Sequence, residues 1–272
     1  MEEQSKEIRK VQRYFIYLSY DGSAYHGWQI QPNGISVQQC INKAVNILLQ
    51  EGISVMGAGR TDTGVHAHLM VAHFDTETEI ECSTFTDRLN KILPPDIAIY
   101  KVVKVNNGAH ARFSPISRTY KYYISTSKDP FNRNYQWYLH FMPDVELMNK
   151  AADLLMDCND FTSFCKLHSD NKTNICQISL AHWEMIEDNK LVFTIKADRF
   201  LRNMVRAIVG TLIDVGRNKI TIDDFKRIIF DKDRCKAGSS APAEGLFLYD
   251  IEYPDKITDL DAEFVNYQIA TE

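Results

Sequence analysis

The sequence lacks the features that mark several classes of protein. Its 272 residues contain no run of 18 or more apolar residues, the length that a helix needs to cross a membrane. The six cysteines include no Cys-x-x-Cys pair, so the common zinc and redox spacings are missing. The first twelve residues are charged and contain no apolar segment typical of a signal peptide. We therefore expect a cytoplasmic protein with reduced thiols.

Flexible-linker residues and excess positive charge are also scarce. Twelve glycines and eight prolines are too few for long linkers, whereas a hydrophobic fraction of 44% and a charged fraction of 25% are typical of a globular protein with a core. Lys and Arg number 31 against 36 Asp and Glu, which gives a net charge of −5. This total excludes a polycationic tail that binds nucleic acid.

The charge is distributed unevenly along the chain. Residues 250–272 carry seven acids against one base, so residues 1–249 sum to +1. Residues 101–140 contain seven Lys and Arg against one acid, and residues 190–220 contain seven against two. A basic cleft built from these two segments therefore remains compatible with the acidic total.

Hydrophobic periodicity predicts the same alternation of strands and helices in both halves of the chain. The first half has strand patterns at 14–20, 53–58, 69–74 and 97–105 and helix patterns at 37–49 and 85–93. The second half has strand patterns at 120–124, 178–186, 191–197 and 246–253 and helix patterns at 145–156, 200–215 and 222–230. Each half resembles a split β-α-β unit of the ferredoxin-like type.

We therefore predict an α+β fold of two ferredoxin-like (βαββαβ) lobes, whose antiparallel sheets form a pseudo-twofold body around a central basic cleft. The N-terminal lobe spans residues 1–108 and the C-terminal lobe spans residues 109–254. Residues 255–272 form an acidic C-terminal tail. Nothing between residues 105 and 120 resembles a flexible linker, so we expect the lobes to pack into one body.

The densest group of candidate chemical residues is the segment Gly57–Ala67, with the sequence GAGRTDTGVHA. Its glycines permit a sharp turn and a close approach of substrate to the main chain. Asp62 lies at its centre, and Arg60 precedes it by two residues. A nearby cation favours the ionised carboxylate, which suits a nucleophile or a base better than an acid.

Asp62 and its neighbours have other interpretations. The side chain could close an Asx turn by binding nearby main-chain amides. Asp62-Thr63-Gly64 also matches the Asp-Thr-Gly of aspartic proteases, but that mechanism needs two such carboxylates and the chain has no second copy. His66 and His68 could start a metal site on one strand face, but catalytic zinc requires a third protein ligand and we find none suitably spaced. We therefore expect no metal.

Cations and aromatic side chains alternate between residues 110 and 123. On a strand, Arg118 and Tyr120 would share one face, and Lys121 would point the other way. Such a surface can hold phosphates and stack exposed bases, as the recognition of single-stranded RNA requires. An amphipathic strand with a solvated cationic face would give the same pattern, and composition alone does not separate the two.

The helix pattern at 200–215 contains a second group of cations. Arg202 and Arg206 are one turn apart, and Arg199 precedes Arg202 by three residues, so we expect the three to share a side of the helix. An arginine stripe is usually a solvated face. Arg206, however, adjoins apolar core positions, so we expect it to be partly buried and to need an anionic partner, for which Asp62 is a candidate.

These segments together make the chain resemble the tRNA pseudouridine synthase A family across residues 14–254. The resemblance is carried, in the family's order, by the motifs YDG at 20–22, GWQIQ at 27–31, SVQ at 36–38, GRTDTGVHA at 59–67, AHF at 72–74, ARFS at 111–114, RTYKY at 118–122, DFTSF at 160–164, FLRNMVR at 200–206 and APAEGL at 241–246. The GRTDTGVHA segment with the ordered set is highly specific. Pro115 stands where the family more usually has a smaller residue, and the tail lies outside the match.

The resemblance implies an isomerase that converts uridine to pseudouridine at positions 38, 39 and 40 of the tRNA anticodon stem-loop. It implies that Asp62 is the catalytic nucleophile, attacking either the base or the sugar. Tyr120 would stack on the target base, Arg206 would pair with Asp62, and Arg60 would help to take the uridine out of its stack. The candidate RNA contacts are His110, Arg112, Phe113, Arg118, Lys121, Lys172, Arg202 and, as an apolar pocket wall, Leu246.

The resemblance further implies a homodimer that uses no metal and no organic cofactor. The alternative from another class is a catalytically idle tRNA-binding protein or chaperone that uses the same cleft. The combination of Asp62, Tyr120 and Arg206 argues against that alternative, because a pure binder needs no such set.

Overall fold

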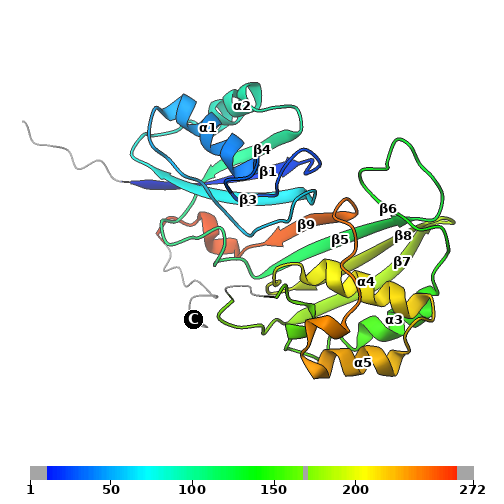
Figure 1. The fold of residues 1–272 in the computed structure, drawn as a ribbon. Helices are drawn as coiled ribbons and strands as arrows, with labels where there is room; N and C mark the ends of the chain where they lie inside the picture. The colour runs from blue at the N-terminus through cyan, green and yellow to red at the C-terminus, as the bar shows by residue number, and fades with distance from the viewer. Residues whose placement is uncertain (1–10, 168–170, 262–272) are drawn as a thin grey trace, which may run out of the picture.

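The structure is a computed structural model in which residues 11–167 and 171–261 are described (Figure 1). In this part of the chain, a largely antiparallel sheet carries five α-helices. The strands are β1 (Gln12–Tyr20), β2 (Met56–Gly57), β3 (His66–Thr76), β4 (Ile97–Lys104), β5 (Ser117–Ser125), β6 (Trp137–Tyr138), β7 (Ile178–Glu187), β8 (Lys190–Ala197) and β9 (Leu246–Glu252). The helices are α1 (Val37–Leu49), α2 (Cys82–Ile92), α3 (Val145–Asp153), α4 (Met204–Gly216) and α5 (Ile222–Asp231), with 3-10 turns η1 (Thr162–Phe164), η2 (Arg234–Lys236) and η3 (Asp255–Thr258).

One continuous sheet joins the two halves of the chain, where the sequence predicted a sheet for each. Its strand order is β4-β1-β3-β9-β5-β8-β7, with β2 beside β3 and β6 beside β5. The last strand, β9, runs parallel to β3 of the first half and antiparallel to β5 of the second. Because β9 pairs with β5 along most of its length and with the first two residues of β3, it bridges the edges of the two halves.

Two apolar cores meet near β9. Helices α1 and α2 lie over the β4-β1-β3 part of the sheet, and α3, α4 and α5 lie over the part formed by β5, β8 and β7 (Figure 1). Leu246 belongs to the core of the second half, whereas Leu248 and Ile251 belong to that of the first. Tyr120 on β5 packs against both cores, which places this side chain at the junction of the two halves.

The strand predicted at 53–58 is confined to the two residues of β2. Asparagine side chains of α1 take the place of a neighbouring strand before it: the Ile53 amide donates to Asn46 Oδ1 at 2.7 Å, and the Val55 amide donates to Asn42 Oδ1 at 2.9 Å. The segment leading to the Asp62 loop is thus held against a helix, a contact that periodicity does not reveal.

The helix predicted at 200–215 begins later, at Met204. Asn203 has a φ of +66°, in the left-handed region, and therefore ends any helical run on its N-terminal side. The amide of Met204 donates to the carbonyl of Leu201 at 3.2 Å, so the residues before α4 form a turn. The helix predicted at 145–156 also differs, because α3 ends at Asp153. The sequence predicted no strand at the position of β6.

The beginning of the acidic tail packs against the body. Ile257 in η3 is buried, and its carbonyl accepts the amide of Asn106 at 3.1 Å. The remainder of the tail, residues 262–272, lies outside the described part. Among the helices that are described, none combines the length and apolar character of a membrane span.

Candidate active site

The loop between β2 and β3 carries Asp62 and packs main chain against main chain on the segment that follows β1. Gly27 has a φ of +79°, and a Cβ built there would lie 2.2 Å from the carbonyl oxygen of Thr61. A Cβ at Gly22 would lie 2.0 Å from the carbonyl oxygen of Val65. Glycine at both positions therefore lets the two segments approach closely, and the contacts hold the loop on either side of Asp62.

Side-chain hydrogen bonds that the sequence did not predict add to this support. The hydroxyl groups of Tyr20 and Thr61 share a buried hydrogen bond of 2.9 Å. Thr61 directly precedes Asp62 in the loop. The amide of Gly22 donates to His66 Nδ1 at 3.0 Å, and His66 Nε2 lies 3.0 Å from the carbonyl oxygen of Asn134. Burial lowers the pKa of His66, and because Nδ1 accepts the Gly22 amide, Nε2 is placed to donate to Asn134.

Asp62 forms an ion pair with a cation from the other half of the chain. Its Oδ2 lies 3.2 Å from Nη1 of Arg206 in α4, the partner expected from the sequence. Arg206 Nε donates in addition to the carbonyl oxygen of Ala241 at 2.7 Å. The side chains of Asp62 and Arg206 are 26% and 21% exposed. The carboxylate is thus held in one orientation but remains open on one side.

A second cation approaches the same carboxylate. Arg202 Nε lies 4.0 Å from Asp62 Oδ1, and its side chain is 55% exposed. The prediction that Arg199, Arg202 and Arg206 share a helix side is wrong, because α4 begins after the first two of them. The turn before α4 nevertheless brings Arg202 to Asp62, so the two arginines reach the carboxylate from the turn and from the helix.

Tyr120 lies on β5, half-buried at the junction of the two cores. Its ring meets that of Phe200 edge-on, with 5.0 Å between ring centroids. Burial, opposed by the cation of Arg118 and aided by the charge of Asp62, raises the pKa of Tyr120 to about 12. Tyr120 is therefore a neutral phenol at physiological pH, suited to stacking and to donating a hydrogen bond.

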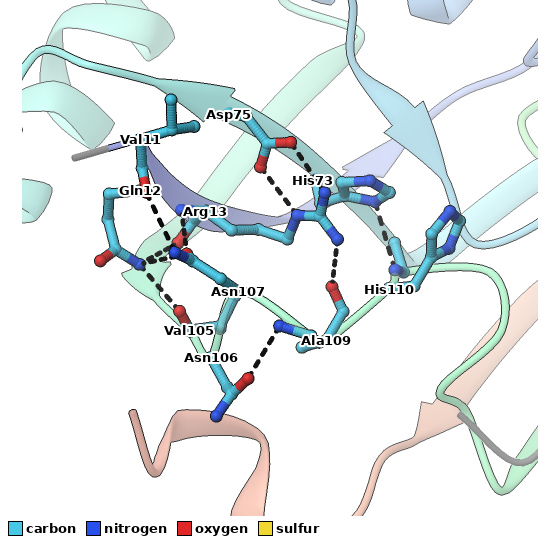
Figure 2. A network of polar contacts seen from close by, with 12 residues as sticks. Val11, Gln12, Arg13, His73, Asp75, Val105, Asn106, Asn107, Ala109 and His110 are labelled. Atoms are coloured by element: carbon cyan, nitrogen blue, oxygen red, sulfur yellow. Dashed lines mark hydrogen bonds and ion pairs between the residues drawn. The ribbon is translucent and has the colours of Figure 1, made fainter. Parts of the chain in front are cut away.

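His110 belongs to a polar network that anchors the connection between β4 and β5 (Figure 2). Its ring centroid lies 4.4 Å from that of His73 on β3. Arg13 holds both oxygens of Asp75 at 2.7 Å and donates to the carbonyl of Ala109 at 2.8 Å. Burial and the nearby Arg13 charge lower the pKa of His110 to about 4, so this ring is uncharged at pH 7.

Several candidate RNA contacts lie at the surface. Arg112 is exposed and its guanidinium lies 5.4 Å from the ring centroid of Phe113, which in turn lies 4.4 Å from that of His110. Arg60, at the start of the Asp62 loop, and Lys172, between η1 and β7, are also exposed. Positive side chains from both halves of the chain are therefore available to solvent.

Three other candidates lie in different environments. Arg118 is only 7% exposed, and its guanidinium binds main-chain carbonyls. Lys121 follows Tyr120 on the strand and so points away from it, with its Nζ 4.0 Å from the ring centroid of Tyr249. Leu246, at the start of β9, is 5% exposed and packs in the core of the second half. Of these three, only Lys121 lies on the side of β5 opposite Tyr120.

The assembled site combines an accessible carboxylate, two guanidinium groups and a neutral phenol. A carboxylate fixed by a cation can act as a nucleophile or accept a proton, and exposed arginines can bind phosphates. In the described ranges, His, Cys, Asp and Glu side chains form no group of three that could hold a metal ion.

Comparisons with known proteins agree with this chemistry. Residues 16–114 and 151–254 match the family model described as tRNA pseudouridine synthase. A Bacteroides thetaiotaomicron protein named tRNA pseudouridine synthase A is 59% identical over 91% of this chain and 93% of its own length. Proteins of the same name from Porphyromonas gingivalis and Thermoanaerobacter pseudethanolicus are 53% and 42% identical, over 90% and 88% of this chain and 98% of their own lengths.

Proposed function

The chain belongs to the tRNA pseudouridine synthase family, and we propose that Asp62 is the nucleophile with which it isomerises uridine to pseudouridine in tRNA. The observation that carries this proposal is the ion pair between Asp62 and Arg206, which leaves the carboxylate accessible and within electrostatic reach of the Tyr120 phenol. A structural Asx-turn carboxylate would need no cation from the distant half of the chain.

The isomerisation exchanges one glycosidic bond for another. The bond between uracil N1 and ribose C1′ breaks, the base rotates, and a bond forms between C5 and C1′; C5 then loses its proton and N1 gains one. Asp62 forms a transient covalent adduct with either the base or the sugar while the base is detached. Atoms and electrons balance without an oxidant or a reductant, so the proposed reaction needs no cofactor.

The neighbouring side chains have separate roles in this proposal. Arg206 orients the Asp62 carboxylate, and Tyr120 stacks on the uracil as a neutral phenol, because its pKa is about 12. Arg60 lies exposed at the entrance to the loop and helps to keep the nucleotide out of its helical stack, which chemistry on a paired base requires. Leu246 forms part of the apolar wall behind the base.

We place the target in the anticodon stem-loop, at positions 38, 39 and 40, on the strength of the family resemblance. Arg112, Lys172 and Arg202 are exposed cations that suit phosphate contacts. The pair of neutral rings, His110 and Phe113, offers a stacking surface beside Arg112. Lys121 lies on the other side of β5, where it could contact a more distant part of the same RNA.

At the level of the whole molecule, we propose two ferredoxin-like lobes around the cleft that contains Asp62, with residues 109–254 as the second lobe. The β1-α1-β2-β3-α2-β4 order of the first half, and helices on each part of the sheet, support this description. We also propose that the protein is a homodimer and that it acts in the cytoplasm.

Incubation of the purified protein with an unmodified tRNA transcript tests this function. Pseudouridine is mapped by carbodiimide treatment followed by primer extension, and we expect stops in the anticodon arm that depend on added protein. Binding of the transcript without any new stop would favour the tRNA-binding protein or chaperone over the enzyme.

A further inference from the structure

Arg118 is buried although it is charged. Its residue is 7% exposed, and it occupies β5 two positions before Tyr120, on the same side of the strand. A guanidinium group loses much of its hydration free energy on burial and is retained only where its N–H groups find acceptors. The acceptors of Arg118 therefore show what the side chain does.

Three main-chain carbonyl oxygens accept hydrogen bonds from this guanidinium. Nη1 donates to Asp198 at 2.7 Å, and Nη2 donates to Arg112 at 2.6 Å and to Ala58 at 3.2 Å. The rigid planar fork of an arginine fixes the relative positions of groups that it binds together. The side chain thus links three segments that are far apart in the sequence.

Each acceptor directly adjoins a part of the candidate active site. Ala58 precedes the loop that carries Arg60 and Asp62. Asp198 precedes the turn that carries Arg202 and leads into α4. The third acceptor, Arg112, is itself an exposed cation in the connection to β5. One guanidinium therefore sets the distances between the nucleophile loop, the arginine turn and the strand that presents Tyr120.

We infer that Arg118 is a positioning residue for the isomerisation, which holds the Asp62 loop and the Arg202–Arg206 segment at the spacing that the reaction requires. This inference rests on the proposed function, because the reaction is what the spacing serves. This role differs from the predicted RNA contact. The guanidinium that would bind a phosphate already donates its hydrogen bonds to main-chain carbonyls. Displacement of catalytic groups by about 1 Å can slow an enzyme by roughly 100-fold.

The test compares Arg118→Lys and Arg118→Met with the wild type, with Arg227→Met as the matched control. Arg227 lies on α5 with a side chain that is 71% exposed. Lysine keeps the charge and the aliphatic stem, and so keeps the protein folded, but one ammonium group does not span three carbonyls. Thermal unfolding of each variant is measured alongside activity, so that a loss of fold is recognised.

Single-turnover pseudouridine formation is measured with enzyme at saturating concentration, and tRNA affinity is measured separately by filter binding. We expect the single-turnover rate of Arg118→Lys to fall roughly 10- to 100-fold, while its dissociation constant for tRNA stays near that of the wild type and the variant remains folded at the assay temperature. Amide hydrogen exchange of Arg118→Lys should accelerate in residues 59–64 and 199–204 but not in α5.

Two results would overturn the inference. One is a wild-type single-turnover rate and unchanged amide exchange in Arg118→Lys. The other is weakened tRNA binding with an unchanged rate at saturation, which would make Arg118 an RNA contact. Both differ from a failure of the proposed function, in which the wild-type protein itself would form no pseudouridine.

Discussion

Asp62 Oδ2 and Arg206 Nη1 lie 3.2 Å apart, although 144 positions separate the two residues in the sequence. The carboxylate comes from a loop of the first half and the guanidinium from α4 of the second. The pair therefore forms only when the two halves are docked through β9. The chemistry of the site depends on the association of the halves and not on either half alone.

Replacement of Arg206 by alanine should slow the reaction without unfolding the protein. The variant removes the group that orients Asp62 and leaves the Ala241 carbonyl without its donor. We expect a loss on the order of 100-fold in single-turnover rate, comparable to the removal of one preorganised electrostatic contact. The comparison variant is Arg202→Ala, which removes a more exposed cation 4.0 Å from the same carboxylate. Arg202→Ala should weaken tRNA binding more than it lowers the single-turnover rate of the enzyme–tRNA complex. A larger effect on the rate than on binding would contradict the assigned roles.

Gly27→Ala should inactivate the enzyme by moving the loop before Asp62. The new Cβ would lie 2.2 Å from the Thr61 carbonyl oxygen, and the φ of +79° is unfavourable for alanine. Gly52→Ala is the matched control, because a Cβ there has no neighbour within 4 Å. Pseudouridine formation and circular dichroism are measured on both. Full activity in Gly27→Ala would show that the close approach of the two segments is dispensable.

The hydrogen bond between Tyr20 and Thr61 should stabilise the fold measurably. Both side chains are buried, so Tyr20→Phe leaves the Thr61 hydroxyl without its partner. We expect the free energy of unfolding to fall by about 1 kcal/mol. A double-mutant cycle with Thr61→Val, followed by urea denaturation, isolates the pairwise contribution. Strictly additive effects would mean that the two hydroxyl groups do not stabilise each other.

Acid should destabilise the protein partly through His73. Burial, followed by the charges of Arg13 and His110, lowers the pKa of His73 to about 3, whereas the unfolded chain has a value near 6.5. Between these pH values the unfolded state binds the extra proton, so the free energy of unfolding falls as the pH drops from about 6.5 towards 3. His73 contributes up to about 1.4 kcal/mol per pH unit to this slope.

The measurement is urea denaturation of His73→Gln between pH 7 and pH 4. Glutamine retains an oxygen that can accept the Ala111 amide, the bond that His73 Nδ1 accepts now at 3.2 Å, but it does not titrate. Its unfolding free energy should depend less steeply on pH than that of the wild type. His140→Gln, which changes an exposed ring, is the control. Equal slopes for wild type and His73→Gln would contradict the account.

The sequence was sufficient for elements whose signals are local. Aromatic, β-rich composition predicted β1 and helical spacing of apolar residues predicted α1, both closely, and the position of Arg206 among core residues predicted its partnership with Asp62. The motif around Asp62 identified the loop that carries the candidate nucleophile. The signals for these features lie in neighbouring residues, even where the contact itself, as between Asp62 and Arg206, joins distant parts of the chain.

Features set by distant contacts were not predictable in this way. The insertion of β9 between β3 and β5 depends on pairing across the whole fold. The shortness of β2 depends on the Asn42 and Asn46 side chains of α1. The cationic and aromatic neighbours of Arg118 predict an RNA contact, whereas its burial depends on carbonyls of Ala58, Arg112 and Asp198.

The central claim is that Asp62 is the nucleophile, and Asp62→Ala tests it most directly. Unmodified tRNA is incubated with the variant under single-turnover conditions, and pseudouridine in the anticodon arm is quantified beside tRNA affinity and thermal stability. We predict that pseudouridine formation is abolished while the folded variant binds tRNA as the wild type does. Pseudouridine formation at the wild-type rate by Asp62→Ala would contradict the account.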